Sequence, residues 1–311
     1  MSEGEQYQDR KIINWPEYNQ ALVNRGSVTF WFDEDIQSVW FHKKEGKTGR
    51  GLDKTFSDTA LQTCLMLRLH YKLSLRSMEG FVNSLFKLMD LPLTCPHHTV
   101  FSKGRGKQLN IQIPRRLPDG PVDIMFDSTG LKVFGEGEWK VRKHGVGKRR
   151  TWRKLHLGVD PNTHDIVVAQ LTTVSISDGE MLPEMLEQLD DDQVVGDVCG
   201  DGAYDRDDCY GAVHWRGGTH IAPPRKDAIE WGDDHPRTQA VRDCETAEGR
   251  KEWKRKTGYH RRSLSETAMF RYKTLIGPTL RARLFETQQV EAYAGLAVIN
   301  RINTLGMPKR A

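Results

Sequence analysis

Three acidic residues lie at positions where carboxylates could hold metal ions. Asp127 and Asp201 each close a short apolar run, and a glycine follows each within three residues, at Gly130 and Gly202. The ends of strands are where α/β sheets place ligands, because helices cover the faces of the sheet. Glu266 is the third candidate. Two carboxylates about 4 Å apart repel by about 4 kcal/mol at an effective dielectric of about 20, so a convergent set requires protons or a bound cation.

Oxygen ligands of this kind suit Mg²⁺, for which Mn²⁺ can substitute. Two such ions, about 3.5–4 Å apart, can activate a water or sugar hydroxyl and stabilise the leaving oxygen of a phosphoryl transfer. We therefore predict two ions at Asp127, Asp201 and Glu266, which would be both the metal ligands and the catalytic residues.

The same residues also have structural interpretations. An aspartate at the end of a strand often forms a turn or caps a helix. Ser263 and Glu266 have the spacing of a capping box, and Arg262 and Glu266 that of an i, i+4 ion pair. If residues 259–273 form one helix, Tyr259, Arg262, Glu266 and Lys273 fall within a sector of about 60°. Spacing alone leaves both interpretations open.

Positive charge is concentrated in two segments, although the chain as a whole carries only +4. Residues 132–156 and 249–273 each hold nine Lys or Arg and two Glu, or +7 each, so the remainder carries −10. Tryptophan and tyrosine are interleaved with these cations, which favours binding to a phosphate backbone over two solvated loops. The DNA-contact candidates in the first segment are Arg142, Lys143, Lys148, Arg149, Arg150, Arg153 and Lys154.

Composition excludes several classes of protein. Apolar residues make up 37% and charged residues 28%, as in a soluble globular protein. The polar first residues and the lack of a long apolar run predict neither a signal peptide nor a membrane span. None of the five cysteines forms a Cys-x-x-Cys pair, so we expect a reducing, cytoplasmic location without disulfides or structural zinc.

The elements that must position these residues change in kind along the chain. Apolar residues at helical spacing predict a helix after Ser57 or Asp58, a second after Ser74, and a third, basic one from Thr99. This pattern is compatible with a helix-turn-helix DNA reader and with any small helical bundle.

Strands dominate after the prolines near residue 115. Strands are expected at 122–127, 155–160, 166–171 and 194–199 and at His220, and helices at 180–189, 205–215, 263–276 and 288–301, with 226–256 irregular. The predicted fold class is therefore α/β, a mixed sheet flanked by helices, with a helical N-terminal domain. The expected divisions are an N-terminal segment and linker at 1–56, the helical domain at 57–118, the catalytic domain at 119–305 and a tail at 306–311.

The spacing Tyr-x2-Arg-x3-Glu-x6-Lys, formed by Tyr259, Arg262, Glu266 and Lys273, resembles a pattern of DDE transposases from bacterial and archaeal insertion sequences. The segments 258–269, 200–205 and 135–144 resemble insertion sequence family five in particular. The resemblance extends from about Asn14 to Pro308, which is nearly the whole chain.

This resemblance implies an RNase H-like catalytic core in which Asp127, Asp201 and Glu266 match the family's two aspartates and glutamate. Tyr259, Arg262 and Lys273 match residues that contact the DNA of the transposon end. The implied activity is cutting at terminal inverted repeats and strand transfer to target double-stranded DNA, with a homo-oligomer in the synaptic complex. A nuclease of the same fold without strand transfer, and a domesticated, inactive DNA-binding protein, are the alternatives.

Overall fold

The computed structural model describes residues 11–42, 55–134 and 151–309. The chain forms two compact units, Met1–Pro114 with Leu284–Ala311, and Arg115–Arg283. Among the described residues, no helix has both the length and the apolar character needed to cross a membrane.

The first unit is helical. The side chains of Ser57 and Ser74 cap two of its helices by accepting hydrogen bonds from Ala60 N (3.0 Å) and Ser77 N (3.1 Å), so both predicted helix starts are confirmed. Its helices are α2 (Trp15–Asn24), α3 (Ile36–Val39), α4 (Asp58–His70), α5 (Leu75–Leu88), α6 (His98–Ser102) and α13 (Phe285–Asn303).

The core of this unit joins the two ends of the sequence. Helix α4 packs against α13, and Leu61, Leu67, Leu296 and Ile299 are completely buried. By its contacts, helix α13 therefore groups with the first unit. Helix α6 has only five residues, and the DNA-reading role of α4, α5 and α6 stays a prediction.

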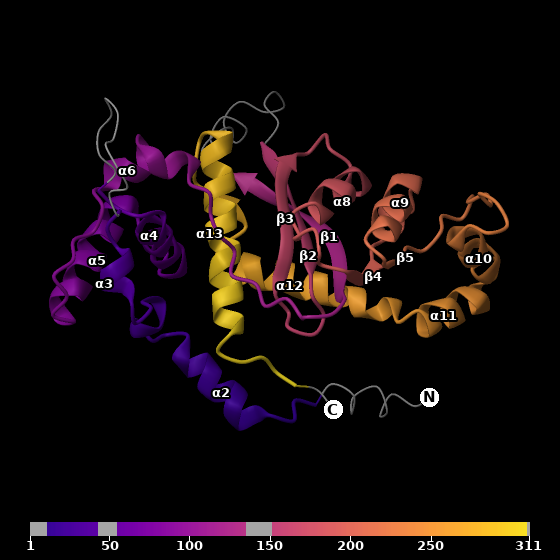
Figure 1. Ribbon diagram of the computed structural model, residues 1–311, viewed down its shortest axis with the longest axis horizontal. Coiled ribbons are helices and arrows are strands. Elements are labelled where there is room, and N and C mark those ends of the chain that lie inside the picture. Colours follow the sequence, from indigo (N-terminus) through magenta and orange to yellow (C-terminus); the bar gives the residue numbers. More distant parts are fainter. Residues whose placement is uncertain (1–10, 43–54, 135–150, 310–311) are drawn as a thin grey trace, which may run out of the picture. The chain divides into compact units, whose positions relative to one another are not determined.

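The second unit contains a six-stranded mixed sheet with the order β3-β2-β1-β4-β5, and β6 pairs with β1 (Figure 1). The pairs β1–β2 and β2–β3 are antiparallel, whereas β1–β4, β4–β5 and β1–β6 are parallel. The sheet is flanked by helices, which makes the fold RNase H-like, as expected. The strands are β1 (Val122–Val133), β2 (Trp152–Val159), β3 (Ile166–Thr173), β4 (Val195–Cys199), β5 (Thr219–Ile221) and β6 (Thr279–Leu280).

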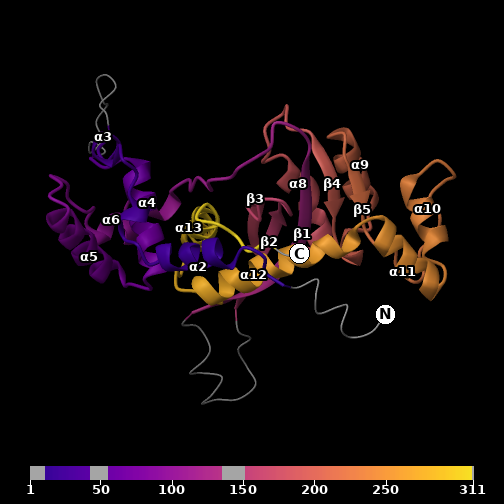
Figure 2. The same cartoon turned by 90° about the horizontal axis from the view of Figure 1, so that it is seen from below.

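Alternation along β1 assigns its residues to two faces. Val122, Ile124 and Phe126 pack with α8 (Asp178–Leu186) and α9 (Asp207–Trp215). Met125 packs on the other face, with residues of α10 (Pro236–Asp243) and α11 (Ala247–Lys256). Asp127 shares the parity of Met125, and α12 (Ser263–Leu275) contacts β1 and β2. Figure 2 shows α12 beneath the sheet and α8 and α9 above it.

Two expectations about elements were wrong. Strand β1 does not end at Asp127 but continues to Val133, because β2 pairs with it as far as Lys132. Residues 226–256 are not irregular, since they contain α10 and α11. Pro236 occupies the first turn of α10, and the side chain of Thr246 caps α11 by accepting from Gly249 N at 3.0 Å.

Candidate active site

The register of two parallel strands places Asp127 level with Asp201. Met125 on β1 is paired with Cys199 on β4, and each aspartate follows two residues later. β4 ends at Cys199, so the chain leaves the sheet as it reaches Asp201. The carboxylate of Asp201 accepts a hydrogen bond from Ala203 N (2.8 Å) and caps the 3₁₀ turn η3 (Gly202–Tyr204). Asp201 therefore does act as a cap, and its second carboxylate oxygen takes no part in that bond.

Glu266 reaches the same region from α12. Residues Tyr259–Arg262 form a 3₁₀ turn, η4, and α12 begins at Ser263, so the helix expected at 263–276 is confirmed, while 259–273 is not one continuous helix. Ser263 lies inside the helix, and the expected capping box with Glu266 does not form. The i, i+4 ion pair does form, with 2.5 Å between Arg262 NH2 and Glu266 Oε1.

The guanidinium of Arg262 connects two of the three carboxylates. Its NH1 donates to Asp127 Oδ2 at 2.9 Å while its NH2 donates to Glu266. The side chains of Arg262 and Asp127 are 19% and 18% exposed, so this contact is partly shielded from water. Among the described residues, Asp127, Asp201 and Glu266 do not present three oxygens within 4.8 Å of one another. An arginine thus occupies the position between carboxylates that a cation would take.

Electrostatics couples all three acids. Burial raises the pKa of Asp127, and the charges of Asp201 and Glu266 raise this pKa further. The N–H of Ser128 and the guanidinium of Arg262 act in the opposite direction. The carboxylates therefore repel one another in this arrangement, and positive charge between them is stabilising.

A second arginine, which sequence reasoning missed, anchors this turn. Arg261 NH1 lies 2.7 Å from Asp123 Oδ2, and its NH2 lies 2.5 Å from Asp197 Oδ2. Each of these aspartates precedes a candidate catalytic aspartate by four residues, on the same side of an extended chain. The repeated Asp-x3-Asp spacing and the tandem arginines were the available signal. Gly258, at φ +65°, turns the chain into η4.

Arg261→Gln should lower the free energy of unfolding by about 1–3 kcal/mol, because Asp123 and Asp197 would face each other without a counter-charge. Arg255→Gln is the matched control, since Arg255 and Glu252 form a surface pair that is 76% and 60% exposed. The control should leave the urea midpoint nearly unchanged, because an ion pair exposed to water contributes little to stability. Urea unfolding measures both variants, and equal losses would show that Arg261 has no anchoring role.

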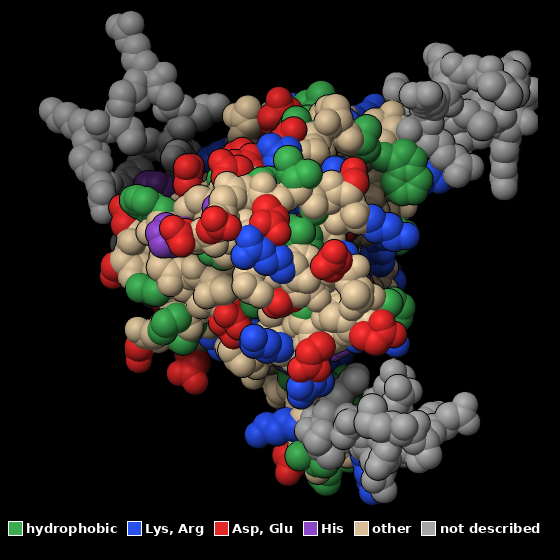
Figure 3. Space-filling model, turned by 90° about the vertical axis from the view of Figure 1, so that its right-hand side faces the viewer, with side chains coloured by type: hydrophobic (Ala, Val, Ile, Leu, Met, Phe, Trp, Pro, Cys, Tyr) green, Lys and Arg blue, Asp and Glu red, His purple; other side chains and the backbone are tan. Residues whose placement is uncertain are grey.

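The basic segments are partly neutralised in the fold. In the second segment, Arg255, Arg261 and Arg262 all pair with carboxylates. Viewed from the side of α10 and α11, acidic and basic side chains are interspersed (Figure 3). In the first segment, Arg153 is half-buried. Arg142, Lys143, Lys148, Arg149 and Arg150 lie outside the described residues.

Lys154 belongs to a half-buried polar cluster. Its Nζ lies 3.1 Å from Asp178 Oδ1 and donates to Ile176 O at 2.8 Å. Asp178 Oδ1 is also 3.6 Å from Nδ1 of the fully buried His156, and burial lowers the pKa of His156 to about 4. Tyr204 is 1% exposed, and its hydroxyl is buried without a hydrogen-bond partner among the described residues. In this conformation the ammonium group of Lys154 is paired with Asp178.

Tyr259, the aromatic residue among the candidate DNA contacts, is held by neighbouring side chains. Tyr259 packs on Trp253 with ring centroids 5.8 Å apart, and Lys254 Nζ and Arg262 Cζ lie 5.3 Å and 5.9 Å from its ring. Lys273 is half-buried on the same helix as Glu266, two turns further along. η4 and α12 thus carry Tyr259, Arg262, Glu266 and Lys273 on adjoining elements.

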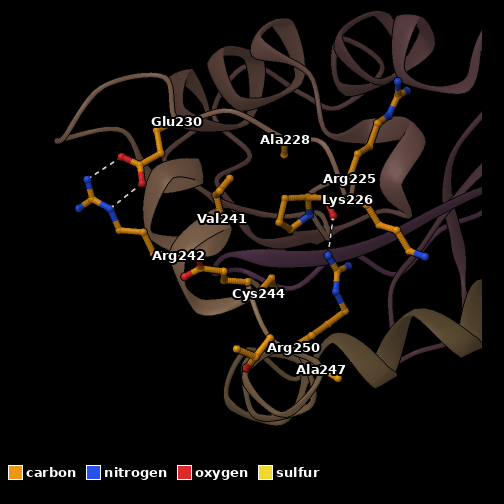
Figure 4. A pocket seen from close by; sticks show the side chains of 12 residues that line it. Arg225, Lys226, Ala228, Glu230, Val241, Arg242, Cys244, Ala247 and Arg250 are labelled. Atoms are coloured by element: carbon orange, nitrogen blue, oxygen red, sulfur yellow. Dashed lines mark hydrogen bonds and ion pairs between the residues drawn. The ribbon is translucent and has the colours of Figure 1, made fainter.

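A cavity of about 660 Å³ lies elsewhere in this unit, between the segment after β5 and helices α10 and α11 (Figure 4). Arg225, Lys226, Arg242 and Arg250 line it, but none of the three candidate carboxylates does. Arg250 donates to Pro224 O at 3.0 Å, and Arg242 pairs with Glu230 and Asp233. Arg225, Lys226 and Arg242 are all exposed, but the charge of Arg242 is already neutralised by its two carboxylate partners.

Two comparisons with protein families match this chain. A family model described as a transposase DDE domain matches residues 118–301, which is more than half of the 311 residues. A second model with the same description matches residues 23–136. The first match includes Asp127, Asp201 and Glu266 as well as all six strands of the sheet.

Proposed function

Because the chain belongs to the DDE transposases, DNA-cleaving enzymes that transfer phosphoryl groups, we propose that Asp127, Asp201 and Glu266 are its catalytic carboxylates. The proposed substrate is double-stranded DNA carrying the terminal inverted repeats of an insertion sequence, and family five is the proposed subgroup. Cleavage would free 3′-hydroxyls, and strand transfer would join them to target DNA within a homo-oligomeric complex.

One observation carries this proposal. Carboxylates from three distant parts of the sequence act on one another electrostatically, and Arg262 bridges Asp127 and Glu266. A merely structural role for each residue requires no such convergence. The bridge also supports a cation site, since positive charge already lies between two acids.

The donor set fits hard divalent ions of the kind that the family uses. Carboxylate oxygens from β1, from the turn after β4 and from α12 suit Mg²⁺ or Mn²⁺, and we propose two ions. Such ions, when bound, supply charge stabilisation and an activated oxygen nucleophile for in-line phosphoryl transfer. The residues of the chain hold the oxygens in place: the sheet positions Asp127, the cap on η3 positions Asp201, and the start of α12 positions Glu266.

Arg262 has two possible partners in this mechanism. Its guanidinium pairs with Asp127 and Glu266 in the DNA-free protein, and a phosphate offers the same bidentate geometry. We propose that the end DNA takes Arg262 from these carboxylates and leaves their oxygens to the ions. Tyr259 and Lys273 are proposed to contact the same DNA, and α4, α5 and α6 to read the terminal repeat.

The exposed cations Arg225 and Lys226 of the cavity wall should also contribute to DNA binding. The double variant Arg225→Gln/Lys226→Gln is expected to reduce the slope of log K against log salt by about 1.8, because each lost phosphate contact removes about 0.9. Arg242→Gln, in the same wall, should leave the slope nearly unchanged, because Glu230 and Asp233 already neutralise Arg242. Fluorescence anisotropy over a series of salt concentrations measures the slope for each protein. If the double variant has the slope of the wild type, Arg225 and Lys226 do not contact phosphate.

An assay with end-containing DNA and Mg²⁺ tests the proposed function as a whole. Joined products support a transposase, whereas cleavage without joining would indicate a nuclease of the same fold. Binding without either reaction would indicate an inactive regulator. The inverted repeats that flank the coding region are the natural substrate, and a scrambled end of the same length is the control.

A further inference from the structure

A cluster of metal-ligating side chains lies in the helical unit, apart from the three carboxylates. Glu79 is on α5, and His97 and His98 are at the start of α6. One ligand atom from each side chain lies within 4.8 Å of the other two, and the described residues contain no second group of this kind. The cluster is open to ions, because His97 is exposed and Glu79 and His98 are half-buried.

The three side chains are held in place by contacts of their own. His98 Nδ1 lies 2.8 Å from Glu79 Oε2, which also accepts a hydrogen bond from His98 N at 2.9 Å. His97 Nδ1 lies 2.8 Å from Thr99 Oγ1. A tetrahedral ion with bonds of about 2.0–2.1 Å places neighbouring ligand atoms about 3.3 Å apart, which differs by only about 0.5 Å from the distance between His98 Nδ1 and Glu79 Oε2. Little movement is therefore required for these two groups to share an ion.

The simpler interpretation is that Glu79 only ties down the first turn of α6. That interpretation accounts for its two bonds to His98, and the imidazole of His97 separately caps α6 by accepting from Thr99 N at 3.4 Å. The rings of His97 and His98 are nevertheless packed together, with centroids 4.0 Å apart and planes at 42°. Two imidazoles beside one carboxylate form the donor set of a His₂Glu metal site, which leaves a fourth position for water.

We propose that Glu79, His97 and His98 bind one divalent cation of the zinc type. Imidazole nitrogen prefers Zn²⁺, Co²⁺ and Ni²⁺, whereas Mg²⁺ prefers an all-oxygen site. The ion would join α5 to α6, a helix of five residues that is too short to be stable alone. It would thus stabilise the junction between the second and third helices of the helical unit. This inference does not depend on the proposed catalytic site.

Zinc titration of the untagged, full-length protein by calorimetry tests the proposal. Millimolar Mg²⁺ is present throughout, so that the candidate catalytic carboxylates compete little for zinc. One high-affinity site is expected, and His97→Gln should weaken it by at least about a hundredfold, because loss of a ligand exceeds the tenfold to hundredfold effect of supporting residues. Glu79→Gln should also weaken it, although a glutamine oxygen can still accept from His98 N. His214→Gln is the control for an exposed histidine elsewhere.

Co²⁺ absorption in the visible range gives a second readout that depends on the ligands and not on activity. The wild type and the His214→Gln variant should give the same spectrum, whereas His97→Gln should lose it. Thermal unfolding should show that zinc raises Tm in the wild type and not in His97→Gln. Equal zinc affinities in the wild type, His97→Gln and Glu79→Gln would overturn the proposal. If His97→Gln fails to fold, Glu79→Gln decides between the two results.

Discussion

Asp127→Asn, Asp201→Asn and Glu266→Gln should each reduce DNA cleavage by at least about a thousandfold, because a bound ion contributes several kcal/mol of charge stabilisation. The amides keep the size of the side chains but lose the charge that holds an ion. Binding of end DNA should persist, since removing negative charge near the DNA does not weaken phosphate contacts. Cleavage of labelled end DNA and a mobility-shift assay measure the two quantities separately.

Asp191→Asn is the matched control, because Asp191 is exposed in the turn that precedes β4, whereas Asp201 follows β4 at its other end. It should cleave at the wild-type rate. Mn²⁺ binding, followed by electron paramagnetic resonance, should weaken in the three variants and not in the control. Wild-type cleavage in any of the three variants would remove that residue from the catalytic set.

Arg262→Gln should strengthen Mn²⁺ binding to the DNA-free protein by about tenfold and yet nearly abolish cleavage. The guanidinium occupies oxygens of Asp127 and Glu266, so an ion must compete with it until a phosphate takes it away. In the wild type, end DNA should therefore tighten Mn²⁺ binding, and by linkage Mn²⁺ should tighten DNA binding by the same factor. The variant should lose this coupling.

Arg262→Lys tests whether the effect depends on the positive charge alone or on the two contacts with Asp127 and Glu266. A lysine keeps the positive charge but cannot hold two carboxylates in the bidentate manner of a guanidinium. We expect its Mn²⁺ affinity to lie between those of the wild type and Arg262→Gln. Mn²⁺ titrations with and without end DNA test the scheme. Equal Mn²⁺ affinity in all three proteins would contradict competition between Arg262 and the ion.

Local pattern predicted most of the sheet and its helices. The hairpin of β2 and β3, strand β4 and helices α8, α9 and α12 are confirmed near the expected bounds, because buried strands and amphipathic helices leave apolar runs of distinct period. Helices α10 and α11 were missed because few of their residues face the core: Trp253 is the single buried residue of α11. Their starts were visible only as Pro236 and Thr246, which are weak signals without an apolar stripe.

The site divides in the same way. Spacing offered Asp127, Asp201 and Glu266 as candidates and Arg262 as an ion-pair partner of Glu266, and the family resemblance singled out the three acids. It could not show that Arg262 also reaches Asp127, 135 positions away in the sequence. Nor could it show that Lys154 pairs with Asp178. The contacts of Arg261, the residue before Arg262, with both Asp123 and Asp197 were equally out of reach. Contacts across such separations depend on where α12 and α8 cross the sheet.

By itself, the sequence determined the family, the order of most strands and helices, and which acids are candidates for catalysis. These properties can be read from the sequence because they depend on the period of apolar residues and on the spacing of motif residues within one segment. Only the tertiary structure decided which cation meets which carboxylate, and how much of each +7 segment stays available to DNA. Coulomb energy depends on distance in space and on burial, and neither quantity can be read from separation along the chain.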